Sequence, residues 1–305
     1  MKLIHYKTID STNTEVLRRL SSVQNIRSLD QTVIAAYEQT AGRGRLKRAF
    51  YSPAKTGIYF TAIHAPKEPI QAPAKLTAAA AVAVCRSLEE LFNVEPKIKW
   101  VNDIYVAGKK VCGLLAEGHI GAQGKIDAAA IGIGINIYPS DFPAEIADRA
   151  GAVLGREQNR TKGQEAAAST DCASKDCSQD QNFAAPLGQE QDCSQAQEAA
   201  ASTDCKATQR AGDIRLVLAR DVSQKLFDLL QNDEQSEAAW EATAAEYAER
   251  SFIIGKEITV VPVIGDERSA YPATVLGIDK EARLLVRLDD GSERALSSGE
   301  ISIRL

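Results

Sequence analysis

Alternating and helically spaced apolar residues divide most of the chain into short elements. Apolar or alternating runs predict strands, and apolar residues recurring every three to four positions predict helices. The predicted strands cover residues 3–6, 32–37, 57–64, 99–103, 104–106, 110–116 and 126–137. One predicted helix begins near residue 12, and three others cover residues 73–92, 213–230 and 236–248.

The last fifty or so residues have a pattern of their own. Short apolar runs separated by turn residues predict strands there, with turns at Gly265-Asp266 and at residues 289–291. The strands cover residues 257–263, 270–278, 284–288, 294–296 and 301–303. This spacing predicts a small all-β barrel, which forms a separate domain over residues 251–305.

Residues 155–212 interrupt the first domain, which otherwise covers residues 1–250. The sequence of residues 164–172 recurs at 197–205, and the whole segment is rich in Ala, Gln, Ser and Asp. Such a composition buries too little apolar surface to fold, so we predict a disordered, repeat-containing insertion. Four of the six cysteines lie in it without CxxC spacing, which argues against a zinc site.

Overall composition narrows the class of protein. Hydrophobic residues make up 44% and charged residues 25%, which is ordinary for a soluble protein. The net charge of −5 argues against a nucleic-acid partner. The N-terminus lacks the apolar core of a signal peptide, and the longest apolar run, residues 76–85, is too short to span a bilayer. We therefore expect a cytoplasmic protein without a membrane partner. Cys85 and Cys112 lie in apolar runs and are predicted core thiols.

The first candidate for chemistry is a loop that follows the strand at 32–37. In it two glycines alternate with two arginines, as Gly42-Arg43-Gly44-Arg45. Glycine lets the backbone approach a ligand, and the guanidinium fork suits phosphate and carboxylate. The pattern favours a mobile loop that closes over an anion, although a solvated basic turn has the same composition.

The second candidate is the stretch Lys99-Trp100-Val101-Asn102-Asp103, which ends a strand and leads into a hairpin. The return strand begins at Lys110. An amide, a carboxylate and an ammonium at one end of a hairpin suit a nucleotide with its metal. Asn and Asp also favour plain turns, and Lys109-Lys110 fits a solvated turn, so both interpretations stay open.

Two further patterns allow either a structural or a functional role. Thr12 and Glu15 have the spacing of a capping box at a helix start, where hydroxyls and free N–H groups can also face a polar ligand. In the strand at 126–137, Gly132 and Gly134 leave one face bare. That face can admit a ligand or pack tightly against a helix.

Five motifs in this order resemble the biotin protein ligase family. They are Ser11-Thr12-Asn13, the Gly-Arg-Gly-Arg loop, Lys-Trp-x-Asn-Asp at 99–103, Lys-x-x-Gly-Leu-Leu at 110–115 and Gly-x-Gly-x-Asn at 132–136. The resemblance covers residues 1–155 and 213–305. It implies an α+β catalytic domain with a mixed, mostly antiparallel sheet and flanking helices, related to class II aminoacyl-tRNA synthetases. It also implies an SH3-like C-terminal barrel.

The implied activity is ATP-dependent formation of biotinyl-5′-AMP, followed by transfer of biotin to a lysine of a biotin carboxyl carrier domain. ATP, Mg²⁺ and biotin are the implied ligands, with Lys110 and Arg45 catalytic and Asp103 contacting the metal. The resemblance assigns biotin binding to Ser11, Thr12, Asn13, Gln39, Arg43, Gly44, Arg45, Lys110 and Gly113. It assigns ATP binding to Gly42, Arg43, Arg45, Phe50, Lys99, Asn102, Gly134 and Asn136.

The chain departs from the family pattern at three positions. Val101 replaces the usual proline, Lys47 replaces a common glycine, and Phe50 stands where many members have tryptophan. No helix-turn-helix segment precedes Met1, so we expect no DNA-binding repressor function. The resemblance allows a monomer or a homodimer.

Three rival functions remain at this point. A lipoate ligase or octanoyltransferase of the same fold typically carries an Arg-Arg-x-(Ser/Thr)-Gly-Gly-Gly type of loop, which this chain lacks. A non-catalytic sensor of biotin is disfavoured by the retention of Lys110, Arg43 and Arg45. An insertion that inactivates the enzyme is disfavoured because residues 155–212 follow the last motif.

Overall fold

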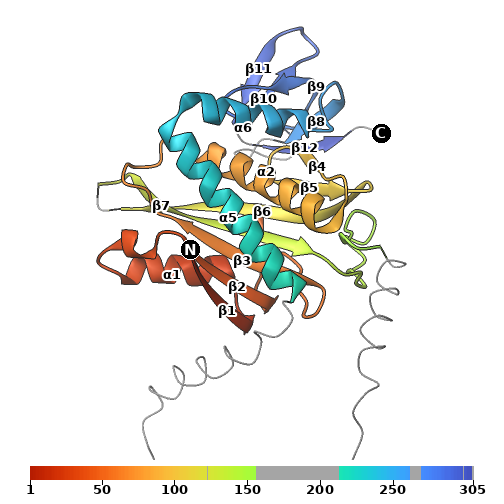
Figure 1. Ribbon diagram of the computed structural model, residues 1–305. Coiled ribbons are helices and arrows are strands. Elements are labelled where there is room, and N and C mark those ends of the chain that lie inside the picture. The colour runs from red at the N-terminus through yellow and green to blue at the C-terminus, as the bar shows by residue number, and fades with distance from the viewer. Residues whose placement is uncertain (122, 156–212, 262–268, 298, 304–305) are drawn as a thin grey trace, which may run out of the picture.

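Two β-sheets and four α-helices make up the described part of the chain. The computed structural model describes residues 1–121, 123–155, 213–261, 269–297 and 299–303 (Figure 1). The first sheet has the order β1 (Lys2–Ile9), β2 (Thr32–Gln39), β3 (Gly57–His64), β7 (Ile126–Asn136), β6 (Lys109–Ile120), β5 (Asp103–Val106), β4 (Lys97–Lys99). The second has the order β11 (Glu293–Leu296), β10 (Leu284–Arg287), β9 (Tyr271–Ile278), β8 (Glu257–Val261), β12 (Glu300–Ile303).

The first sheet is mixed, with one parallel pair. β1 runs parallel to β2, and every other neighbouring pair in this sheet is antiparallel. The predicted α+β class with a mostly antiparallel sheet is therefore confirmed. All neighbouring pairs of the second sheet are antiparallel.

Helices cover both faces of the first sheet, which explains why its central strands are continuously apolar. On one face α1 (Thr12–Ser22) packs Val16 and Leu20 against buried residues of β2, β3 and β7. On the other face lie α2 (Pro73–Phe92) and α5 (Ile214–Gln235), with α6 (Glu237–Glu249) against both (Figure 1). The two short 3₁₀ helices are η1 (Ile26–Leu29) and η2 (Arg45–Lys47).

Two local predictions were wrong. The N-cap of α1 is Ser11, whose Oγ accepts from the Thr14 N–H, so Thr12 and Glu15 form no capping box. Glu15 pairs instead with arginines one turn further along α1. Residues 99–103 are not one strand, because residues 100–102 form the turn between β4 and β5 and Lys99 pairs with Asp103.

Several predictions concern residues outside the described part. Residues 156–212 of the predicted insertion lie there, with its repeats and its four cysteines. The predicted turn at Gly265-Asp266 lies there too. The core thiols are confirmed, since Cys85 and Cys112 are buried and free.

Both tryptophans of the chain attach the second sheet to the first domain. The Trp100 indole Nε1 donates to the Ala282 carbonyl oxygen at 3.0 Å, and the Trp240 Nε1 donates to the Lys280 carbonyl oxygen at 2.5 Å. Each indole is 3% exposed. The β9–β10 turn is thus hydrogen-bonded to both the β4–β5 turn and α6. These bonds fix the second sheet beside the first.

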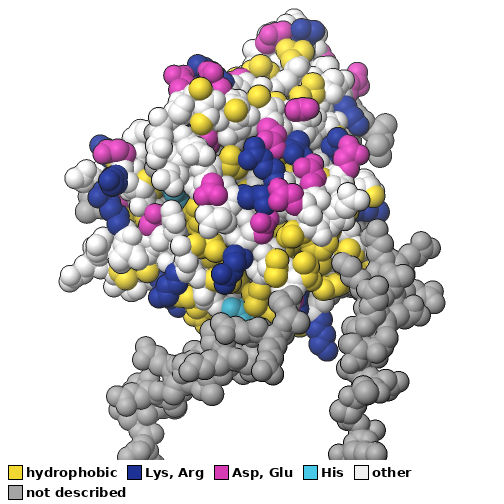
Figure 2. Space-filling view, viewed as in Figure 1, with side chains coloured by type: hydrophobic (Ala, Val, Ile, Leu, Met, Phe, Trp, Pro, Cys, Tyr) yellow, Lys and Arg dark blue, Asp and Glu magenta, His cyan; other side chains and the backbone are white. Residues whose placement is uncertain are grey.

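The helical face carries acidic and basic side chains side by side (Figure 2). Arg86 pairs with Glu246, Arg250 pairs with Glu89, and Lys225 pairs with Glu90. Such mixed charge differs from the basic surface that typically binds nucleic acid. Among the described helices, none has the length and apolar character needed to cross a lipid bilayer.

Candidate active site

A cavity of about 500 Å³ opens on the α1 face of the first sheet. It lies between the start of α1, the Gly-Arg-Gly-Arg loop, and the surface of β6 and β7. Every residue of the predicted site except Gly42 lines it. Gly42 lies at the base of the loop, where its carbonyl accepts from the Phe50 N–H at 2.9 Å. Motifs that are far apart in the sequence therefore meet in one place.

Glycines form the floor of this cavity. Gly113 of β6 and Gly134 of β7 are paired across the strands, and a Cβ on either would come within 2.8 Å of the Phe50 ring. A Cβ on Gly132 would lie 2.0 Å from Asn13 Oδ1. The bare strand face is therefore covered partly by the helix start and partly by an aromatic ring from the loop.

One end of the cavity is a hydrogen-bonded network of neutral side chains. The Thr12 N–H and hydroxyl both donate to Gln39 Oε1, at 2.9 and 3.1 Å, and Gln39 Nε2 donates to Ser52 Oγ. Thr61, fully buried on β3, lies 2.8 Å from Thr12 Oγ1 and 2.7 Å from Asn13 Oδ1. This network fixes the orientation of the amides, so the remaining free hydrogen-bonding groups are in place before a ligand binds.

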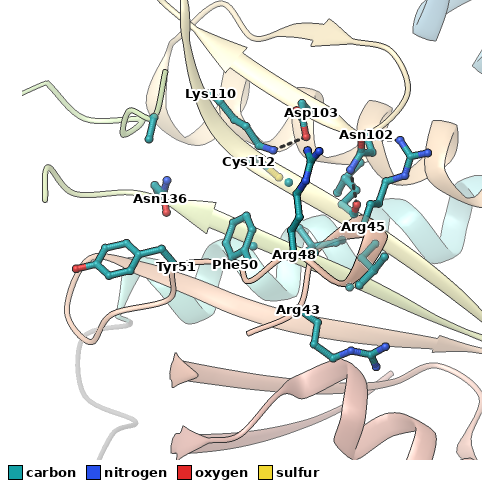
Figure 3. Close-up of a pocket in the computed structure, with 18 of the residues that line it drawn as sticks. Arg43, Arg45, Arg48, Phe50, Tyr51, Asn102, Asp103, Lys110, Cys112 and Asn136 are labelled. Atoms are coloured by element: carbon teal, nitrogen blue, oxygen red, sulfur yellow. Dashed lines mark hydrogen bonds and ion pairs between the residues drawn. The ribbon is translucent and has the colours of Figure 1, made fainter. Parts of the chain in front are cut away.

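The other end is cationic. Lys110 Nζ lies 2.5 Å from Asp103 Oδ1, and Arg45 Nη1 donates to Asn102 Oδ1 at 3.4 Å. Asn102 is held in turn by its Nδ2, which donates to the Leu114 carbonyl at 2.8 Å. Figure 3 shows Lys110, Asp103, Asn102 and Arg45 around this end. One carboxylate among several cations leaves a net positive site that suits an anionic ligand.

Two more predicted residues, Asn136 and Lys99, line the cavity. Asn136, at the end of β7, donates through Nδ2 to the Gly151 carbonyl at 3.1 Å, and Lys99 lines the wall from β4. Arg43 turns away from Lys110, and its Nη2 lies 2.7 Å from Glu117 Oε1 (Figure 3). The two loop arginines thus point toward opposite ends of the cavity.

Burial keeps the hydroxyl and thiol groups of the cavity in their neutral forms. Desolvation raises the pKa of Tyr59 to about 12 and that of Tyr105 to about 12. Burial also raises the pKa of the Cys112 thiol well above its ordinary value. A thiol held neutral is a poor nucleophile, so Cys112 is not suited to nucleophilic catalysis.

Three residues of the site were missed by the sequence reasoning. Arg48 lines the cationic end, Thr61 links the neutral network, and Glu117 joins Arg43 to Asn13. Thr61 and Glu117 did carry a signal. Each is a polar residue in or next to an apolar strand, and Glu117 is four residues beyond Gly113 and hence on the same face of β6.

Family models match both parts of the chain. Residues 6–136 match the biotin/lipoate A/B protein ligase family. Residues 253–304 match the biotin protein ligase C terminal domain. The two matches lie in both domains of the chain and support a biotin protein ligase. The resemblance inferred from the five motifs is confirmed.

Curated relatives agree with these two matches. The bifunctional ligase/repressor BirA of Bacillus subtilis is 37% identical over 148 residues, which are 48% of this chain and 44% of that protein. The biotin–[acetyl-CoA-carboxylase] ligase of Mycobacterium tuberculosis is 34% identical over 148 residues, 47% of this chain and 52% of that protein. The chain thus spans about half the length of the curated relatives it matches.

A solved structure shares the fold over nearly the whole length. Biotin protein ligase from Aquifex aeolicus, in complex with biotin and ATP, has a TM-score of 0.66 and 23% identity. The similarity covers 99% of this chain and 98% of that one. The small C-terminal β domain of the family is therefore present here as the second sheet.

Proposed function

We propose that the protein is a biotin ligase, which activates biotin with ATP and transfers it to a lysine of a carrier protein. The observation that carries this proposal is the polarity of the cavity. A neutral, pre-ordered network lies at one end, and Lys110, Arg45 and Arg48 lie at the other. Biotin has the same polarity, with a neutral ureido head and a carboxylate tail.

The neutral end suits the ureido group. Buried ureido N–H and C=O groups need hydrogen-bond partners. Ser11 is 2% exposed, and its Oγ accepts one bond from the Thr14 N–H, so its hydroxyl proton is available to a ligand carbonyl. One N–H of Gln39 Nε2 is used by Ser52. Gln39 lines the cavity, so its second N–H can supply another donor.

In the first step a biotin carboxylate oxygen attacks the α-phosphorus of ATP. The bond from that phosphorus to its bridging oxygen breaks, and pyrophosphate leaves with the electron pair. Negative charge grows on the phosphoryl oxygens, so fixed cations lower the barrier. Lys110 exchanges Asp103 for the carboxylate and the α-phosphate, and Arg45 holds the nucleotide beside Asn102.

In the second step a lysine amine of the carrier attacks the acyl carbon of biotinyl-5′-AMP. The acyl C–O bond breaks, AMP leaves, and the amine proton passes to solvent or to Asp103. Closure of the Gly-Arg-Gly-Arg loop excludes water from the mixed anhydride until the carrier arrives.

Mg²⁺ fits one position in this scheme. No group of three or more His, Cys, Asp or Glu suited to a metal occurs in the described ranges. Mg²⁺ is commonly held by one or two carboxylates together with substrate phosphates. Asp103 is the carboxylate in the cavity wall, and it would hold Mg²⁺ against ATP, where the ion neutralises phosphate charge.

Further features belong to the same proposal. The acceptor is the biotin carboxyl carrier domain of a carboxylase, and the ligase acts in the cytoplasm as a monomer or homodimer without nucleic acid. Phe50 and Asn136 contact the adenine side. The first domain is related to class II aminoacyl-tRNA synthetases, and the second sheet is an SH3-like barrel. The proposed domain boundary lies after residue 250. Separate expression of residues 251–305 checks it, because an independent domain should fold without the rest of the chain.

We expect transfer to be selective for biotin. A carrier domain incubated with the protein, ATP and Mg²⁺ should gain the mass of one biotinyl group, and none with lipoate or octanoate, because neither acid has a ureido head for the neutral network. Intact-protein mass spectrometry measures the product. Modification by lipoate at a comparable rate would reassign the chain to the lipoate ligases, and binding of biotin without modification would make it a sensor.

A further inference from the structure

Glu117 connects the Gly-Arg-Gly-Arg loop to the start of α1. It lies on β6, on the same face as Gly113, with 23% of its side chain exposed. Its Oε1 is 2.7 Å from Arg43 Nη2, and its Oε2 accepts from Asn13 Nδ2 at 2.9 Å. Both carboxylate oxygens are thus used, one by the loop and one by the start of α1.

Asn13 depends on this carboxylate for its orientation. Its Nδ2 has Leu115 O at 3.2 Å and Glu117 Oε2 as acceptors, while its Oδ1 lies 2.7 Å from the Thr61 hydroxyl and against Gly132. Asn13 is 5% exposed. Because the amide has a partner on each side, loss of Glu117 leaves a buried N–H group unsatisfied, which favours another rotamer.

Arg43 depends on Glu117 for its position. The loop residues 43 and 49 form an isolated antiparallel bridge, and Gly44 N–H donates to the Arg48 carbonyl at 2.8 Å. In this small hairpin Arg45 reaches Asn102 at the cationic end, whereas Arg43 points away from Lys110 (Figure 3). Glu117 is the carboxylate that holds Arg43 over the neutral end.

We propose that Glu117 is a positioning residue that closes the neutral end of the cavity over the head group of the acid substrate. It acts through Arg43 and Asn13 and touches neither ATP nor the reacting atoms. This inference rests on the proposed function, and it names the substrate as a carboxylic acid with a neutral, polar cyclic head. The consequence is that Glu117 governs recognition of the acid and retention of the adenylate.

Glu117→Gln should raise KM for biotin roughly tenfold and leave KM for ATP within about twofold, as expected for loss of a charge-assisted hydrogen bond at one end of the cavity. AMP released without a carrier should rise by a similar factor, because the loop holds the adenylate less well. Arg43→Gln should raise KM for biotin by a similar factor. The double variant should be no worse than either single variant, since the two side chains act as a pair.

Tryptic cleavage tests the contact without any substrate. In the free protein, Glu117→Gln should speed cleavage after Arg43 and Arg45 several-fold, because the loop then opens more often. Glu293→Gln is the matched control. It removes a carboxylate from an exposed pair with Arg287 at 3.0 Å, far from the loop in sequence and in the second sheet. A thermal midpoint close to that of the parent protein shows that each variant is folded.

Three results would overturn the inference: unchanged cleavage, equal increases in KM for biotin and ATP, or additive effects in the double variant. The proposed function fails separately. If the parent protein neither activates nor transfers biotin, the ligase assignment is lost, while the cleavage rates still decide whether Glu117 holds the loop.

Discussion

Replacement of Lys110 by alanine is expected to reduce biotin-dependent ATP–pyrophosphate exchange by about 10²–10³-fold, the usual cost of removing one fixed charge donor from a transition state. Lys110 Nζ lies 2.5 Å from Asp103 within the cationic end of the cavity. Its ammonium lines the cavity, where we expect it to contact both the biotin carboxylate and the α-phosphate. The loss should appear in kcat, because the interaction strengthens as charge develops.

The neighbouring lysine gives a matched control for this prediction. Lys109 is exposed and donates through Nζ to the Asp148 carbonyl, outside the cavity wall. Lys109→Ala should therefore keep exchange within about threefold of the parent rate. Exchange by Lys110→Ala above a tenth of the parent rate would show that Lys110 is not the main cation of the first step.

Trp100→Ala is expected to lower the free energy of unfolding by about 3–5 kcal/mol, as for other buried aromatic truncations. The indole is 3% exposed, donates to Ala282 and lies 3.9 Å from the Cβ position of Gly299. Its loss opens a cavity between the two domains. The change also loosens the turn that leads into Asn102 and Asp103, so nucleotide affinity should fall as well.

Urea unfolding followed by circular dichroism measures this loss. Trp100→Phe keeps most of the ring and removes the indole N–H, so it should cost only about 1 kcal/mol. A loss below 1 kcal/mol for Trp100→Ala would mean that the Trp240 contact with Lys280 alone holds the turn.

The sequence predicted most of the strands well, and it predicted that the motif residues lie close together because each motif lies where a regular element ends. The loop after β2, the β4–β5 turn and the start of β6 all carry residue types that suit both a turn and ligand binding. The family resemblance predicted that these three segments meet in one cavity. Local pattern alone left a solvated turn equally open for the arginine loop.

Other features depended on contacts that no local pattern contains. Ser11 and Thr12 are both suitable N-cap residues, with serine the more favoured, and Thr12 is bonded to Gln39 across the sheet. The residues around Trp100 do not indicate whether its side chain contacts a nucleotide or another domain. Glu117 gains its partners from residues 74 and 104 positions away, so its role became visible in three dimensions.

The most direct test of the account is exchange of labelled pyrophosphate into ATP without a carrier protein. Biotin should support exchange, and lipoate and octanoate should not, because the neutral network and the cationic end together fit a ureido acid. Exchange supported by lipoate, or tight biotin binding with no exchange, would contradict the assignment of Lys110 and Arg45 to biotin activation.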